Sequence, residues 1–131
     1  YPLGSVRYNG VIFDIISTMS RNPKLEFKFW ISGNNGSLMG KGKVRLLEAI
    51  QETGSIRKAA TSLKMSYKKA WNQVNTMNLE AQTPVVIKTS GGAGGGGAVV
   101  TDEGMRLMKN YSKLSENCMR LIEEEFKKYN F

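Results

Sequence analysis

The chain has 131 residues, of which 19 are basic and 11 acidic, and it contains no histidine and a single cysteine, Cys118. This length has room for one domain with one core, and the composition lacks the signs of a disordered, fibrous or membrane-spanning protein. One cysteine excludes an internal disulfide, and the lack of histidine removes the commonest general base and a usual zinc ligand. We therefore expect a cytoplasmic protein that is not an enzyme, with no catalytic residues, no metal, no cofactor and no membrane partner.

The positive charge lies mostly in the middle of the chain. Residues 41–90 carry an excess of six positive charges, against two in residues 1–40 and none in residues 91–131. This distribution is typical of a polyanion-binding surface attached to a neutral structural element. A lysine-rich surface that only favours solubility would have the same charge, so the pattern of the residues must distinguish the two.

The N-terminal residues give little information about the fold. The chain opens with Tyr1-Pro-Leu-Gly-Ser5 and no initiator methionine, as a vector-derived remnant would, so these residues are left out of the fold prediction. Residues 6–20 could form an amphipathic helix or could lie upstream of a natural start at Met19. Residues 1–23 are therefore expected to be a remnant followed by an extension or a helix.

Residues 24–39 have the pattern of a β-hairpin. From Lys24 to Ser32 apolar residues alternate with polar ones and with Trp30, which predicts a strand with one buried face. The apolar positions of that face are Leu25, Phe27, Phe29 and Ile31. The segment Gly33-Asn-Asn-Gly36 predicts a turn, and a short return strand is expected around Ser37–Met39.

Three helices are predicted in the basic third of the chain. Apolar residues have helical spacing from Lys43 to Thr53, and Gly54 supplies a stop. Ser55 is expected to cap a short second helix that contains the adjacent residues Ala59 and Ala60. A third helix is expected to begin at a serine cap, Ser66, and to run to about Gln82.

The second and third helices together have the pattern of a helix-turn-helix. Small residues lie where two helices must approach closely, and apolar residues between Leu63 and Val74 fix the angle between the helices. The turn position that is often glycine is Lys64, which costs up to ~1 kcal/mol if its backbone is left-handed.

A second hairpin and a long helix complete the chain. Pro84 ends the third helix, and the β-rich runs 85–89 and 98–100 flank a glycine-rich tip. This tip lacks the Gly-Lys-Ser/Thr ending of a nucleotide-binding loop, so a flexible wing is the preferred interpretation. Thr101 is expected to cap the last helix, whose first turn carries Asp102 and Glu103.

The outward face of the third helix is the candidate DNA-reading surface. Lysine can donate to guanine and asparagine can bind adenine, which gives five candidates for base reading: Ser66, Tyr67, Lys68, Lys69 and Asn72. Four basic residues around this face are candidates for phosphate contacts: Lys41, Lys43, Arg57 and Lys88. Backbone of the wing can approach a phosphate closely at its glycines: Gly91, Gly92, Gly94, Gly95, Gly96 and Gly97. The alternative is that this is only the solvated face of an amphipathic helix.

The last helix carries an apolar stripe. Five of its residues recur at alternating spacings of four and three: Leu107, Tyr111, Leu114, Cys118 and Leu121. Ile122 directly follows the last of them. Because a lone helix cannot bury such a stripe on itself, we expect a dimer interface, with an intramolecular core as the alternative.

Six short segments within residues 24–115 resemble a known family. They are Gly40-Lys-Gly-Lys-Val-Arg-Leu-Leu-Glu-Ala-Ile50, Thr53-Gly-Ser-Ile56, Met65-Ser-Tyr-Lys-Lys-Ala-Trp71, Met77-Asn78, Gly91-Gly-Ala-Gly-Gly-Gly-Gly-Ala98 and Thr101-Asp-Glu-Gly104. Together they resemble the N-terminal winged-helix domain of the molybdate-responsive ModE regulators, which is similar to the DNA-binding domain of LysR-type regulators.

This resemblance implies a dimeric DNA-binding module whose long terminal helix pairs two subunits. It also implies that residues 66–69 begin the recognition helix, and that the regulated genes concern metal-oxyanion uptake or cofactor metabolism. In the ModE family a separate C-terminal domain binds molybdate, and this chain ends at Phe131, so a stand-alone DNA-binding domain without an oxyanion ligand is expected. Ala93 stands where a basic residue is common in the family, which weakens a phosphate contact at the wing tip.

The sequence thus predicts an α+β, mostly helical fold: a winged helix-turn-helix with an N-terminal β-hairpin, a glycine-rich wing and a long C-terminal dimerisation helix. Residues 24–101 are the predicted DNA-binding domain and residues 102–131 the dimerisation helix. The predicted function is a homodimeric, sequence-specific regulator of transcription on double-stranded DNA, with the recognition helix in the major groove and the wing on the backbone. The alternative is a winged-helix protein-interaction module that binds nucleic acid weakly and without sequence preference.

Overall fold

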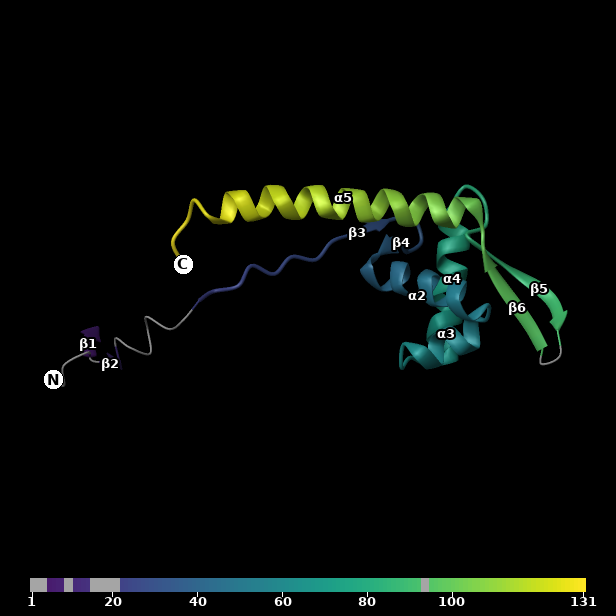
Figure 1. Ribbon diagram of the computed structural model, residues 1–131. Helices are drawn as coiled ribbons and strands as arrows, with labels where there is room; N and C mark the ends of the chain where they lie inside the picture. Colours follow the sequence, from purple (N-terminus) through teal and green to yellow (C-terminus); the bar gives the residue numbers. More distant parts are fainter. Residues whose placement is uncertain (1–4, 9–10, 15–21, 93–94) are drawn as a thin grey trace.

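The computed structural model describes residues 5–8, 11–14, 22–92 and 95–131 (Figure 1). The elements, in chain order, are β1 (Ser5–Tyr8), β2 (Val11–Asp14), β3 (Trp30–Ser32), β4 (Ser37–Gly40), α2 (Lys41–Thr53), α3 (Ile56–Ser62), α4 (Tyr67–Glu80), β5 (Val86–Gly92), β6 (Gly95–Val100) and α5 (Asp102–Phe126). The strands form three separate antiparallel pairs. This architecture confirms the predicted α+β winged helix-turn-helix.

The first hairpin, β1–β2, replaces the helix considered for residues 6–20. Its register runs from Ser5 opposite Asp14 to Tyr8 opposite Val11. The β-branched and aromatic residues of these strands favour extended backbone, and the dipeptide between the strands, Asn9-Gly10, is the strongest short signal for a hairpin. A helix is therefore wrong for the two strands, and residues 15–20 lie outside the described part of the chain.

The predicted hairpin at residues 24–39 is shorter than expected. Only Trp30–Ser32 pairs with the return strand β4, while residues 22–29 have no strand partner. The return strand ends at Gly40, where α2 begins, so nothing remains for residues 24–29 to pair with. Phe27, expected on a buried face, is exposed for the same reason, and Ile31 is exposed although it pairs with Met39.

The turn of this hairpin is attached to the end of α4. The carboxylate of Glu80 accepts hydrogen bonds from the backbone N–H groups of Asn34 and Asn35, at 2.7 and 2.6 Å. The N–H of Gly33 also donates to the carbonyl of Gly36, at 2.7 Å. The hairpin thereby holds the C-terminal end of α4 in place.

The helix-turn-helix forms where the local signals placed it. Gly54 ends α2 with a left-handed φ of +69°, and its N–H donates to the Ile50 carbonyl. Ser55 caps α3 by accepting a hydrogen bond from the Lys58 N–H, at 3.2 Å. Lys64 has a φ of +56°, so the left-handed backbone considered for this turn position is present.

One core holds the three helices, the hairpin roots and α5 together. Its buried apolar side chains are Met39, Val44, Leu46, Leu47, Ala49, Ile50, Ile56, Ala59, Ala60, Ala70, Val74, Met77, Val85, Val86, Ala98, Met108 and Tyr111. Ala59 and Ala60, the small residues expected at the helix contact, are almost completely buried. Their small side chains allow α3 to pack closely against α2 and α4.

The root of the wing is joined to α4 by one side chain. The amide oxygen of Asn78 accepts from the N–H groups of Val85 and Val86, at 2.8 and 3.1 Å, and its NH₂ donates to the Val86 carbonyl. The N–H of Ala98 on the other strand donates to the carbonyl of Gly54. The wing and α4 are therefore coupled at the base of the wing.

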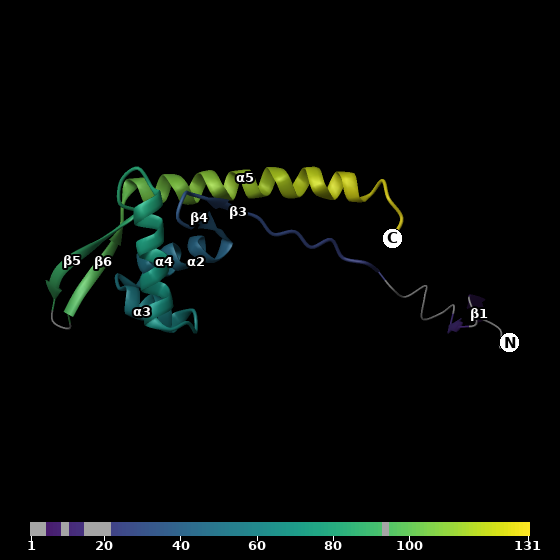
Figure 2. The ribbon, with the colours of Figure 1, turned by 180° about the vertical axis from the view of Figure 1, so that it is seen from behind.

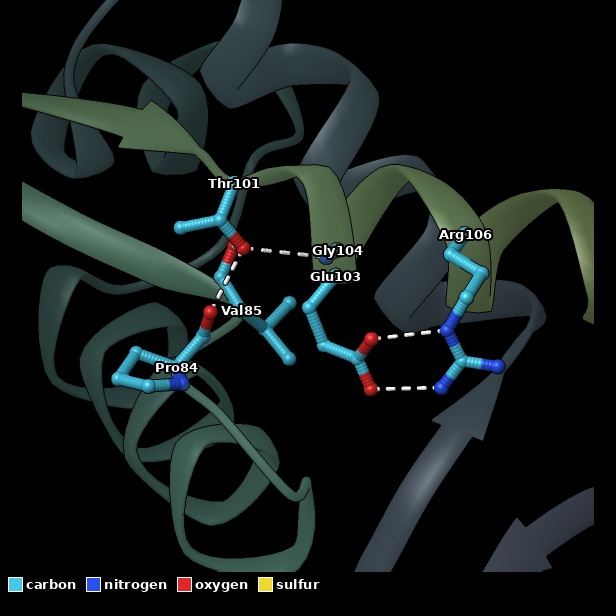
Figure 3. A network of polar contacts seen from close by, with 6 residues as sticks. All are labelled: Pro84, Val85, Thr101, Glu103, Gly104 and Arg106. Atoms are coloured by element: carbon cyan, nitrogen blue, oxygen red, sulfur yellow. Dashed lines mark hydrogen bonds and ion pairs between the residues drawn. The ribbon is translucent and has the colours of Figure 1, made fainter.

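Helix α5 starts against this root, as Figure 3 shows. The Thr101 hydroxyl donates to the Pro84 carbonyl at 2.6 Å and accepts from the Gly104 N–H at 3.1 Å, which confirms Thr101 as the predicted cap. Glu103 and Arg106 form an exposed ion pair, and the hydrogen bonds from Arg106 lower the pKa of the Glu103 carboxyl. Beyond its first turns, α5 extends away from the domain (Figures 1 and 2).

Candidate nucleic-acid interface

Helix α4 begins beside α3, at the end of the domain away from α5 (Figure 1). The hydroxyl of Ser66 accepts from the Lys69 N–H at 3.1 Å and so fixes the start of the helix, as predicted. Ala70, Val74 and Met77 are buried. This orientation leaves the side chains of the first two turns free to meet a ligand.

A hollow of about 330 Å³ lies on the polar face of α4. Its lining is entirely polar or charged: Lys43, Ser66, Lys68, Lys69, Asn72, Gln73 and Thr76. Sites of about 300–1,000 Å³ for small molecules are lined mainly by apolar and aromatic side chains, so this lining does not suit one. Ammonium, amide and hydroxyl groups instead match the donors and acceptors on base edges.

Lys43 and Gln73 line this hollow, although neither was a predicted base-reading residue. Lys43, expected to contact phosphate, reaches the hollow from the first turn of α2, and desolvation by burial lowers the pKa of its ammonium group. Gln73 was missed altogether, because on a helical wheel it lies between the buried and the exposed face. Its Oε1 atom is enclosed and makes no hydrogen bond with any described residue.

A second groove, of about 510 Å³, separates the start of α4 from the wing. Its lining residues come from α3, α4 and both wing strands: Ser55, Ile56, Arg57, Lys58, Tyr67, Lys88, Thr89, Gly96, Gly97 and Ala98. Arg57, Lys58 and Lys88 supply three positive charges here. Lys58 was not among the predicted phosphate contacts, although its position directly after Arg57 in the first turn of α3 was a usable signal.

Aromatic rings hold two of the cations in this region. The guanidinium carbon of Arg57 lies 4.3 Å from the centre of the Tyr67 ring. The Lys88 ammonium lies 5.6 Å from the centre of the Trp71 ring. Such cation–π contacts restrict the cations without neutralising them. Tyr67, expected among the base-reading residues, thus lies in the groove beside the wing.

The electrostatic character of both hollows is uniformly positive. No acidic side chain lines either of them. Within the described ranges, ion pairs join Arg106 to Glu103 and Lys128 to Glu125, both far along the chain from the interface. Lys41, the remaining phosphate candidate, is exposed at the start of α2 and lines neither hollow. The positive charges of the interface are thus available to an external anion.

The wing glycines fall partly inside the strands. Gly91 and Gly92 end β5, and Gly95–Gly97 begin β6, with Gly92 opposite Gly95. The strands therefore continue further into the glycine-rich tip than their β-branched residues alone predicted. Ala93 and Gly94 lie outside the described residues.

The stripe on α5 divides into a packed part and an exposed part. Tyr111 is buried, its ring lies 5.0 Å from that of Phe29, and its hydroxyl donates to the Phe29 carbonyl at 2.8 Å. Leu107 packs against the core, whereas Leu114 and Leu121 are 42% and 64% exposed. Tyr111 thus belongs to the core of its own chain, contrary to the expectation that it faces a second subunit.

Cys118 and Ile122, the other two residues of the expected interface, are half-buried on α5. Both lie in the second half of α5, which runs from Asp102 to Phe126. None of the described helices has the length and hydropathy needed to cross a membrane.

Comparison with known proteins places this interface in a family. Residues 42–105 match the model of bacterial regulatory helix-turn-helix proteins of the lysR family. The molybdenum transport protein ModE of Azotobacter vinelandii is 43% identical over 79 residues, which cover 60% of this chain and 29% of that protein. The molybdenum-pterin-binding protein MopB of Rhodobacter capsulatus is 41% identical over 95 residues, or 72% of this chain and 35% of that protein.

A third relative is the DNA-binding transcriptional dual regulator ModE of Escherichia coli K12, 40% identical over 74 residues, or 56% of this chain and 28% of that protein. The matched region thus spans 28–35% of the length of these three relatives. The fold and the basic face of α4 define a winged helix-turn-helix domain of the kind found in bacterial regulators. Residues 42–105 match a LysR-type helix-turn-helix, and the chain is similar to regulators of the ModE type. The resemblance found in the sequence motifs is thereby confirmed.

Proposed function

We propose that this chain binds double-stranded DNA sequence-specifically, as a homodimer, and regulates transcription in the cytoplasm. The observation that carries the proposal is the wholly polar and basic hollow on the exposed face of α4, next to a second basic groove under the wing. In this arrangement the helix face meets base edges in the major groove, and the groove meets the phosphate chain.

The division of the domain follows from the same proposal. Residues 24–101 bind DNA and residues 102–131 pair the subunits, except that the first turns of α5 belong to the core of the DNA-binding part. Lys68, Lys69 and Asn72 are the central base-reading residues, and Arg57, Lys58 and Lys88 bind phosphate. The names of two relatives also mention molybdenum, but the matched region covers only 29% and 35% of those proteins, so we propose DNA binding alone.

Charge along α5 supports pairing of two copies in opposite directions. Residues 102–113 carry three basic and two acidic side chains, a net charge of +1, whereas residues 114–126 carry one basic and four acidic side chains, a net charge of −3. Antiparallel pairing places the basic half of one helix opposite the acidic end of the other, whereas parallel pairing places like charges together. The exposed Leu114 and Leu121 supply the apolar contact between the two helices.

The test is selection from a randomised duplex library, followed by binding of selected and unselected duplexes across a salt series. A dimeric specific regulator enriches a palindrome with half-site centres about 10 bp apart, bound at least ~1,000-fold more tightly than unselected DNA. Weak binding that is lost with salt, without enrichment, would instead support the protein-interaction module.

Replacement of Asn72 tests whether the exposed face of α4 contacts base edges. Asn72→Ala is expected to remove about 1–3 kcal/mol of base discrimination at one position of each half-site, because its bidentate contact is lost. Asn75→Ala, on the same helix but outside the hollow, is the matched control. Equal base preferences in both variants and the unaltered chain would remove Asn72 from the reading face.

A further inference from the structure

Lys43 shares its surroundings with the base-reading candidates and not with the phosphate-binding ones. Its side chain lines the hollow on α4 together with Lys68, Asn72 and Gln73, although it comes from a different helix. Arg57 and Lys88 line the separate groove under the wing. A phosphate contact is expected at the edge of an interface, whereas Lys43 is half-buried beside the face that meets base edges.

Gln73 contributes an unsatisfied acceptor to the same hollow. Its Oε1 atom is enclosed by protein and has no hydrogen-bond partner within the described part of the chain. An enclosed amide oxygen without a donor is energetically costly, so such groups are almost always paired in the functional state. An ammonium group has three donors and no acceptor, and Lys43 is the cation that α2 brings to this hollow.

We propose that Lys43 and Gln73 act together as base-specificity residues for guanine. When the duplex is bound, the Lys43 ammonium donates to Gln73 Oε1 and to guanine O6, and the Gln73 NH₂ group donates to an acceptor on the same base edge. Guanine is the base that offers two acceptors, N7 and O6, in the major groove. This inference rests on the proposed function, because it requires α4 to lie in that groove.

Disruption of the pair is expected to change which base is preferred. A glutamine that is free to use both its acceptor and its donors binds adenine N6 and N7 bidentately. Without the Lys43 ammonium nothing holds the Gln73 oxygen inward in the complex, so the amide can turn about its last torsion and present both its oxygen and its NH₂ group to the base edge. The expected result is therefore a shift of preference from guanine to adenine, and not only a loss of affinity.

Site selection from a randomised duplex library with the full chain tests the inference. Lys43→Met keeps the length of the apolar stem and is expected to shift the ratio of guanine to adenine binding at one position per half-site by roughly tenfold. Lys41→Met, two residues earlier in the same helix and outside the hollow, is the matched control. It is expected to weaken all duplexes alike and to leave base preference unchanged.

A second variant distinguishes joint action of Lys43 and Gln73 from an effect of Lys43 alone. Gln73→Met is expected to lower guanine preference by itself, and the double variant Lys43→Met/Gln73→Met is expected to show no further loss, because the two residues act as one unit. Circular dichroism of each variant checks that the fold is retained. Additive losses would overturn joint action of the two residues.

The outcomes also distinguish this inference from the proposed function. If the unaltered chain selects a palindrome but Lys43→Met weakens all duplexes equally, Lys43 is a phosphate contact and the inference is wrong while the proposed function stands. If the unaltered chain selects no sequence at all, the proposed function fails and this inference fails with it.

Discussion

Lys64 has a left-handed backbone, with φ of +56°, in the turn between α3 and α4. A side chain with a Cβ atom is strained in this conformation, whereas glycine is not. The carbonyl groups at the end of α3 still receive their bonds, since the N–H of Lys64 donates to Thr61 and that of Met65 to Ala60. The turn is therefore formed by its hydrogen bonds in spite of the strain.

Lys64→Gly is expected to stabilise the domain by up to ~1 kcal/mol, because release of the strain exceeds the added flexibility of the unfolded chain. Urea unfolding at fixed protein concentration measures this change. Lys58→Gly, in the regular helix α3, is the control and is expected to cost about 1 kcal/mol. Destabilisation of similar size at both positions would show that the left-handed turn carries no strain.

Single residues also show what a helical wheel can and cannot predict. The wheel correctly gave the buried side of α4, as Ala70 and Val74 confirm, because burial depends on direction around one axis. Lys43 was predicted to contact phosphate because it lies near the DNA-facing elements, and Tyr67 was predicted to read bases because it lies at the start of the third helix. Their actual neighbours are set by α2 and by the wing, which come from distant parts of the sequence. Gln73 was missed because the wheel places it between the buried and the exposed side of α4.

At the scale of elements, the features that depend on a few adjacent residues were predicted correctly. Ser55, Ser66 and Thr101 cap their helices by bonds to an N–H three residues ahead. The features that depend on a distant partner were not: residues 24–29 look like a strand, but the return strand ends at Gly40. Strand length is fixed by the shorter partner, and alternation along one segment cannot show that.

The junction of α5 with the wing root depends on close approach at Gly104. A Cβ atom at this position would lie 2.6 Å from the Val85 carbonyl oxygen and 2.7 Å from Val100 Cγ1. Only a residue without a Cβ atom allows the helix to begin directly against both wing strands. The direction in which α5 leaves the domain is therefore set at its first turn.

Gly104→Ala is expected to destabilise the domain by about 1–3 kcal/mol, since backbone has to move to admit the methyl group. Thermal unfolding at fixed concentration measures the loss. Gly42→Ala is the matched control, because a Cβ atom there has nothing within 4 Å. It lies in the helix α2 and should stabilise by roughly 0.5–1 kcal/mol. Stability that is unaffected by Gly104→Ala would mean that the junction can shift freely.

At the scale of the whole molecule, α5 lies across one end of the domain and α3 lies near the other (Figures 1 and 2). The surface proposed to pair subunits is thus remote from the surface proposed to bind DNA. Substitutions on the exposed part of α5 should therefore affect assembly without direct loss of a DNA contact.

Leu121→Glu is expected to convert the dimer to a monomer, because it places charge in the apolar contact between two copies of α5. Sedimentation equilibrium measures the mass, and binding to a two-half-site duplex should weaken far more than binding to a single half-site. Leu79→Glu replaces another exposed leucine, on α4, and should leave the mass unchanged. A dimer that survives Leu121→Glu would place the subunit contact elsewhere.

The Asn78 amide, which joins the wing root to α4, has a consequence for how binding sites of this class can diverge. Because wing and helix are fixed to one another, the distance between a base contact and its flanking phosphate contact is constant within each half-site. The separation between half-sites is governed by a different element, α5. Substitutions on the exposed face of α4 can therefore change which bases are preferred, while the spacing between the half-sites of the operator stays the same.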